Sequence, residues 1–181
     1  MELESSKLIL RKAEFNDCQL FSKWESKPDV PEFLYENDER TYEEEVTNFV
    51  NFSQDDTKEL YTILKKPGKE PIGRLSLVDI NHALDSLNIA RLYIADESDR
   101  GQGYGSEAMR IIVEYAFINL HMERVTAYHF GEGDAIGKLA TEIGFKEEGV
   151  LRHAGKIDGK YIDLHLLSLL RAEYFETIHR K

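Results

Sequence analysis

Apolar residues recur along the chain with two different spacings, and each spacing predicts one kind of element. Short runs rich in β-branched and aromatic residues predict strands at 8–11, 59–66, 71–80, 88–95, 123–130, 144–152 and 161–170. Apolar positions at i, i+3 and i+4 predict helices at about 16–24, 42–52, 106–120 and 134–143. Turn residues at 67–70 and 158–160 predict two hairpins. The order predicts a mixed α/β (α+β) fold with antiparallel hairpins around one strand–loop–helix–strand unit.

Helix-start signals support the first two helices. Phe15 and Leu20 flank Asn16 and Gln19 in the pattern of a hydrophobic staple around an N-cap. Thr41 and Glu44 have the spacing of a capping box, which predicts the start of the second helix.

Length and cysteine content predict one domain, residues 1–181, in a reducing compartment. A chain of 181 residues can bury a sizeable core without staples, and Cys18 is its single cysteine. The N-terminus lacks the pattern of a secretory signal, and no apolar run reaches the roughly 20 residues of a membrane span. We therefore expect a cytoplasmic protein without a membrane or nucleic-acid partner.

The net charge of −11 is concentrated in one segment. Residues 25–59 contain twelve acidic and three basic residues, a balance of −9. Such a run either keeps a pair of helices solvated or creates a field that attracts cations.

A glycine-rich stretch follows the strand predicted at 88–95. Gly101, Gly103 and Gly105 alternate with other residues and lead directly into an apolar helical pattern. Free N–H groups and the positive end of a helix dipole make such a turn an anion site. A Walker loop does not fit, because Ser106 and Glu107 stand where Lys-Ser/Thr is needed. The G-x-G-x-G spacing also matches a dinucleotide fingerprint poorly.

A third type of phosphate-binding loop fits the glycine-rich stretch, and this loop is typical of one enzyme family. Arg100, Gly103 and Gly105 match the R/Q-x-x-G-x-G/A signature of the GNAT superfamily of acetyl-CoA-dependent N-acetyltransferases. The element order resembles that fold over roughly residues 7–175. The segments YAFINLHMERV and IGFKEEGVLRHAGKIDGKYIDLHLLSLLRAEY resemble the branch of ribosomal-protein N-terminal and spermidine acetyltransferases. The resemblance implies a mostly antiparallel twisted sheet with helices on both faces and a central strand–loop–helix acetyl-CoA site.

The resemblance also implies a reaction, the direct transfer of an acetyl group from acetyl-CoA to a primary amine in a ternary complex. It assigns the diphosphate to the loop amides and the pantetheine arm to the preceding strand. The implied cofactor-binding residues are Leu92, Tyr93, Ile94, Arg100, Gly101, Gln102, Gly103, Tyr104, Gly105, Ser106 and Lys138.

The usual catalytic side chains of the family are missing. The position of the glutamate falls on Ile89, or on Asn88 if the strand carries a one-residue shift, and the asparagine and tyrosine positions fall on Gly133 and Ala140. The chain is therefore either an enzyme that relies on proximity and water-borne protons or a non-catalytic acyl-CoA-binding module.

Substitute catalytic groups are Asp79, Tyr93 and His129, which are weak candidates for the base or acid. The remaining histidines show no ligand spacing, so no metal site is expected; they are His82, His121, His153, His165 and His179.

The acceptor is expected to be a cationic amine, either a polyamine or a protein N-terminus. In the GNAT fold the N-terminal helices and their loop lie over the acceptor, so the acidic segment would lie there. The candidate contacts are Glu32, Glu36, Asp38 and Glu39. The apolar segment LLSLLRAEYF fits either a homodimer interface, as in some relatives, or plain core.

Overall fold

An eight-stranded sheet forms the centre of the computed structural model, which describes residues 2–27, 41–131, 135–157 and 159–179. Its strands lie in the order β1-β2-β3-β4-β5-β6-β8-β7. The strands are β1 (Glu2–Glu4), β2 (Leu8–Lys12), β3 (Glu59–Lys65), β4 (Glu70–Asn81), β5 (Ser86–Ile94), β6 (Arg124–His129), β7 (Lys146–Ile157) and β8 (Lys160–Leu170). β5 and β6 run parallel, whereas the other neighbours are antiparallel, which confirms the mixed, mostly antiparallel sheet.

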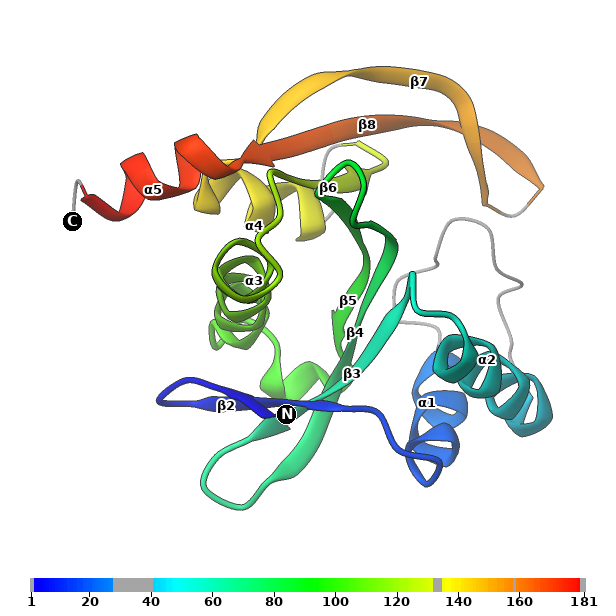
Figure 1. The fold of residues 1–181 in the computed structure, drawn as a ribbon. Helices are drawn as coiled ribbons and strands as arrows, with labels where there is room; N and C mark the ends of the chain where they lie inside the picture. Colours follow the sequence, from blue (N-terminus) through cyan, green and yellow to red (C-terminus); the bar gives the residue numbers. More distant parts are fainter. Residues whose placement is uncertain (1, 28–40, 132–134, 158, 180–181) are drawn as a thin grey trace.

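Helices cover both faces of the sheet, as the resemblance implies (Figure 1). The helices are α1 (Asp17–Glu25), α2 (Tyr42–Gln54), α3 (Tyr104–Glu114), α4 (Ala135–Ile143) and α5 (Arg171–His179), with a 3₁₀ turn at Glu97–Asp99 and a π turn at Tyr115–Asn119. α3 and α4 pack their apolar faces on the large core, and α1 and α2 cover the opposite face over a smaller cluster. The two faces are called the α3 face and the α1 face below.

The two helix-start signals have different outcomes. Thr41 and Glu44 form the predicted capping box, with each side chain accepting from the other's backbone N–H. Asn16 lies at the N-cap position, but its backbone dihedrals are helical and its side chain makes no capping hydrogen bond. The Asp17 carboxylate instead accepts from the Glu14 N–H at 2.8 Å. Phe15 packs edge-on against Phe49, so it links α1 to α2.

A one-residue bulge in β5 changes which side chains face each side of the sheet. Arg91 pairs with Ser76 and Ile89 pairs with Leu77, so Ala90 has no partner on β4. Before the bulge Leu87 and Ile89 belong to the α3-face core; after it Leu92 and Ile94 do. The extra residue bends the strand and exchanges the two faces.

β5 and β6 separate at the same point. They pair from Ser86 with Arg124 to Ile89 with Ala127, and no pair follows. β6 continues beside β8 as far as His129, while β5 continues beside β4 as far as Ile94. The sheet is therefore open between β5 and β6 from Ala90 onward.

Candidate functional site

Main-chain groups of β5 line one edge of this opening. The Ala95 N–H donates to the Ile72 carbonyl of β4 at 2.8 Å. In an antiparallel pair the N–H and C=O of one residue point to the same edge, and successive residues alternate. Tyr93 and Ala95 therefore point to β4, whereas Leu92 and Ile94 direct their main-chain groups toward the opening. An extended ligand can pair with these groups as an added strand.

The glycine loop lies at the end of the same strand. Gly101 and Gly103 have φ values of 72° and 84°, and a Cβ on either would meet no atom within 4 Å. Gly103 is the N-cap of α3, and the Glu107 N–H donates to its carbonyl at 3.0 Å. The amides of Tyr104, Gly105 and Ser106 precede that first helical bond, so they are free to face an anion. The empty space over the glycines is where such an anion can approach the main chain.

Arg100, which is predicted to bind the cofactor, makes contacts that hold the loop. Its amide donates to the Glu97 carbonyl at 3.1 Å. Its guanidinium donates to the carbonyls of Ile94 and Ala95 at 2.8 and 2.9 Å. Both contacts fold the loop back onto the end of β5. Gln102 also binds within the loop, where its side-chain amide donates to the Ser98 carbonyl at 2.5 Å.

Gly105 permits close packing of two helices. Its conformation is helical, and an added Cβ would lie 3.2 Å from the Leu139 Cδ1 atom of α4. Lys138, the neighbour of Leu139 on α4, is exposed. Gly105 therefore brings α4 next to the start of α3.

The bulge decides which residue takes the position of the family's glutamate. Ile89 is 1% exposed and packs in the α3-face core, so it cannot act on a ligand. Asn88 points to the α1 face, is 9% exposed, and its Oδ1 atom has no hydrogen-bond partner among the described residues. Ala140, on α4, is fully buried in the α3-face core and carries no group that could donate a proton. Gly133 lies outside the described residues.

The Tyr93 hydroxyl, which is predicted as a candidate catalytic group, has a buried partner inside the protein. Its ring lies in the cluster on the α1 face, and its hydroxyl donates to the Glu25 carboxylate at 2.9 Å. Burial raises the pKa of the Tyr93 phenol well above its ordinary value, and the neighbouring Glu25 carboxylate raises it further. The phenol therefore has a structural partner in α1.

Glu25 is the centre of a buried ion network that ties α1 and α2 to the sheet. It accepts from Arg74 of β4 at 2.5 Å and from Arg91 of β5 at 2.8 Å. Arg74 also pairs with Glu45 of α2 at 3.1 Å, and both side chains are 1% exposed. Burial raises the pKa of Glu25, but Arg74 and Arg91 outweigh it and lower the pKa below its ordinary value.

The acidic segment is therefore only partly a surface field. Glu25 and Glu45, two of its twelve acids, are neutralised inside the protein. The four predicted acceptor contacts lie outside the described residues; they are Glu32, Glu36, Asp38 and Glu39.

Asp79 and His129 lie at different ends of the opening. Asp79 is exposed, has a φ of 52°, and lies in β4 beyond the pair Val78–Asn88. At that point β5 still pairs with β6, so Asp79 is on the closed side. His129 follows Ala127 at the end of β6, beside the open side. Tyr93 and His129 both lie on the open part of their strands, but the Tyr93 ring packs in the cluster on the α1 face.

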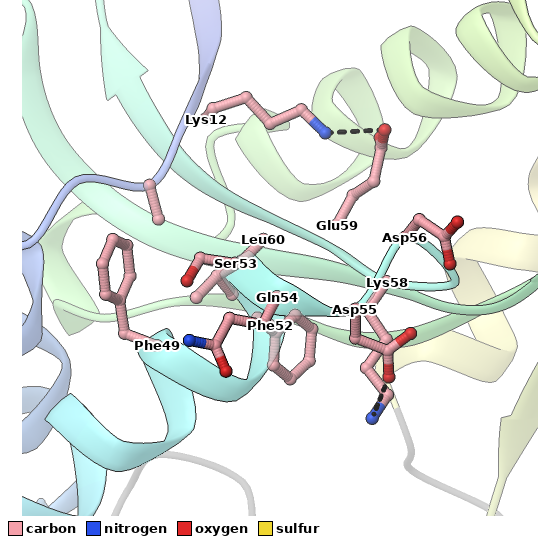
Figure 2. A pocket seen from close by; sticks show the side chains of 11 residues that line it. Lys12, Phe49, Phe52, Ser53, Gln54, Asp55, Asp56, Lys58, Glu59 and Leu60 are labelled. Carbon is pink, nitrogen blue, oxygen red and sulfur yellow. Dashed lines mark ion pairs between the residues drawn. The ribbon is translucent and has the colours of Figure 1, made fainter.

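A separate depression of about 510 Å³ lies between the end of α2 and the start of β3 (Figure 2). The rings of Phe49 and Phe52 line it, and two ion pairs lie among its lining residues, Lys12 with Glu59 at 2.7 Å and Lys58 with Asp55 at 2.9 Å. β4 separates β3 from β5 in the sheet, so this depression is not part of the opening.

Comparison with known proteins gives concordant matches. A family model described as an acetyltransferase (GNAT) domain matches residues 7–146. An uncharacterized N-acetyltransferase of Bacillus licheniformis is 27% identical over 185 residues, covering 95% of this chain and 97% of the relative. The spermidine N(1)-acetyltransferase of Vibrio cholerae is 24% identical over 170 residues, covering 94% and 96%. A crystal structure of spermidine N-acetyltransferase from Vibrio cholerae, in complex with CoA and spermine, superposes with a TM-score of 0.84 at 22% identity, covering 94% of this chain and 99% of that one.

No helix in the described part of the chain is long and apolar enough to cross a membrane.

Proposed function

Because the chain belongs to the GNAT acetyltransferase family, an acetyl-CoA-dependent family of enzymes, we propose that it transfers the acetyl group directly to a cationic primary amine in a ternary complex. One observation carries the proposal. The open edge of β5 leads through the short 3₁₀ turn at Glu97–Asp99 into the glycine loop and the start of α3, so the fold offers main-chain partners to a thioester arm and to a diphosphate along one path. The match of residues 7–146 to the family supports it.

Two groups of main-chain atoms bind different parts of the acetyl donor, acetyl-CoA. The amides of Tyr104, Gly105 and Ser106, with the positive end of α3, hold the diphosphate. The main-chain groups of Leu92 and the N–H of Ile94 align the pantetheine arm along β5, while the Ile94 carbonyl accepts from Arg100. The positive φ values of Gly101 and Gly103 and the open space above them support this division.

Proton handling rests on alignment rather than on a tuned carboxylate. A free amine with a pKa near 10.4 is only about one part in a few thousand neutral at pH 7. The position nearest to a family-type base is Asn88, whose amide cannot accept that proton. Holding the two reactants in line lowers the barrier by several kcal/mol, and water carries the proton away.

The acceptor proposed here is a polyamine or a basic protein N-terminus. The acidic balance of residues 25–59 supports a positive acceptor, and so does the similarity to a spermidine acetyltransferase. The acceptor KM is then expected to rise as salt increases from about 20 to about 300 mM, since the Debye length falls below about 8 Å over that range. A flat KM, with neutral mono-amines acetylated as fast as spermidine, would contradict this choice.

A second candidate function is a non-catalytic acyl-CoA-binding module. The specific observation in its favour is that a buried Ile89 and an Asn88 without a carboxylate occupy the position of the base. Release of free thiol from acetyl-CoA, measured over a panel of amines, distinguishes the two functions. Turnover with any amine supports the enzyme, whereas calorimetric binding of acetyl-CoA with no turnover supports the module.

The proposed compartment is the cytoplasm and the proposed assembly is a homodimer, and both proposals rest on the sequence. A buried free Cys18 as the single cysteine suits the reducing cytoplasm. A homodimer through the C-terminal segment is the assembly to be tested by light scattering on the purified protein.

A further inference from the structure

Three strands bring together a group of side chains that sequence spacing does not connect. His129 of β6 pairs across the strands with His165 of β8, and the two rings stack at 4.6 Å with an angle of 21°. The Glu147 Oε2 atom of β7 lies 3.1 Å from His165 Nδ1 and 3.9 Å from His129 Nε2. One donor atom from each residue lies within 4.8 Å of the other two.

Glu147 has no full positive charge beside it in the described part of the chain. A second bulge, between Glu147 and Gly149, puts the neighbouring carboxylate of Glu148 on Arg124, at 2.5 Å, instead. Among the described residues, the ion-pair partners of Glu147 within 4.0 Å are the imidazoles of His129 and His165, which carry no charge when deprotonated. One carboxylate and two imidazoles together are donor groups that suit a divalent transition metal ion.

The site is held in place on one side and accessible on the other. Gly137 packs α4 directly on His129, since an added Cβ would lie 2.8 Å from the His129 Cγ atom. The exposed fractions of the side chains are 15% for His129, 29% for His165 and 50% for Glu147. An ion can therefore enter past the carboxylate and meet two imidazoles fixed on paired strands.

We propose that His129, His165 and Glu147 form a site for a divalent transition metal ion, with Zn²⁺ as the best match. At metal–ligand distances of about 2.0–2.2 Å, tetrahedral ligand atoms lie about 3.3 Å apart. The His165–Glu147 spacing of 3.1 Å is close to this value, whereas the His129–Glu147 spacing of 3.9 Å must shorten and the two stacked rings must tilt toward a common point when the ion binds. Two nitrogens and one carboxylate favour Zn²⁺ over Mg²⁺ or Ca²⁺, which prefer oxygen ligands. Three protein ligands leave a position open for water.

One contact limits the affinity. The Gly131 N–H donates to His129 Nδ1 at 3.2 Å. Metal binding through Nε2 places the ring proton on Nδ1, so this hydrogen bond must break. A hydrogen-bond acceptor at the ring nitrogen that does not bind the metal increases metal affinity by about 10- to 100-fold. His129 has an N–H donor at that nitrogen instead, so it lacks this increase.

The test is titration of the dialysed, tag-free protein with ZnCl₂ by calorimetry, with Co²⁺ absorption as a spectroscopic readout. We expect one equivalent of Zn²⁺, visible Co²⁺ bands from nitrogen ligation, and no comparable heat from Mg²⁺. His165→Gln and Glu147→Gln should each weaken Zn²⁺ binding at least tenfold.

His82→Gln is the matched control, because His82 is exposed in the turn between β4 and β5 and lies outside the cluster. Its Zn²⁺ affinity should equal that of the wild type. The absence of a one-equivalent transition, equal binding of Mg²⁺, or unchanged affinity in both cluster variants would overturn the metal site. These readouts do not use acetyl transfer, so they are independent of the proposed enzymatic function.

Discussion

Gly103→Ala separates the folding role of the glycine loop from its binding role. Gly103 has a φ of 84° at the N-cap of α3. An alanine in the left-handed region costs about 1–2 kcal/mol, which lowers the Tm of a chain of this size by about 2–8 °C. The new methyl group also enters the open space above the loop. Loss of one hydrogen bond from an amide to a charged phosphate costs about 1.5–3 kcal/mol, or about 10- to 150-fold in affinity.

The assay compares the acetyl donors acetyl-CoA and acetyl-pantetheine, which lacks the diphosphate. Gly103→Ala should lower kcat/KM for acetyl-CoA and leave that for acetyl-pantetheine unchanged, and calorimetry should show the same loss for CoA binding. Gly68→Ala is the control, because a Cβ there also meets open space but its φ is not positive. If Gly103→Ala lowers the Tm but binds CoA as tightly as the wild type, the loop does not hold the diphosphate.

Three other predictions concern stability. Glu25→Gln leaves Arg74 and Arg91 without their buried carboxylate, so urea unfolding should show a loss of about 3–5 kcal/mol; a loss below about 1 kcal/mol would contradict the network. Arg124 is the main cause that lowers the pKa of Glu148 from 4.5 to about 2, so its stabilisation is present above the unfolded pKa and disappears as pH falls toward 2. Glu148→Gln should accordingly lower the Tm at neutral pH and not near pH 2, and an equal loss at both would refute the assignment. Acetyl-CoA at a hundred times its Kd should stabilise the protein by about 2.7 kcal/mol, measured as a rise in Tm, whereas desalted protein that melts at the same temperature with and without it would exclude tight binding.

Local patterns were sufficient for most of the elements and for the glycine loop, but they did not predict β1 or α5. The capping box at Thr41 and Glu44 acts within one turn, so sequence alone could predict it. The loop at Gly101 and Gly103 was predictable for the same reason, because the left-handed conformation is a property of single residues. The contacts of the Arg100 side chain could not be predicted, because its partners, the carbonyls at the end of β5, come within reach only once the loop folds back.

Contacts between distant segments were beyond sequence reasoning. Glu25 reaches Arg74 and Arg91 only because α1 lies across β4 and β5, and a count of charges along the chain treated it as surface. His129 and His165 meet through strand register, which no spacing in the sequence specifies. The bulge has one signal in the sequence. The alternating apolar positions of β5 shift from odd-numbered residues, Leu87 and Ile89, to even-numbered residues, Leu92 and Ile94, and these are the residues that lie in the core.

The shape of the opening depends on the number of residues in β5, through the bulge at Ala90, rather than on the identity of the side chain there. Ala90 is exposed and has no partner on β4, so its side chain can change freely. Deleting it, by contrast, would exchange the inward and outward positions of everything up to Ile94 and remove the bend where β5 leaves β6. Substitutions can therefore accumulate around the opening over evolution while its shape persists, and a single lost codon would erase it.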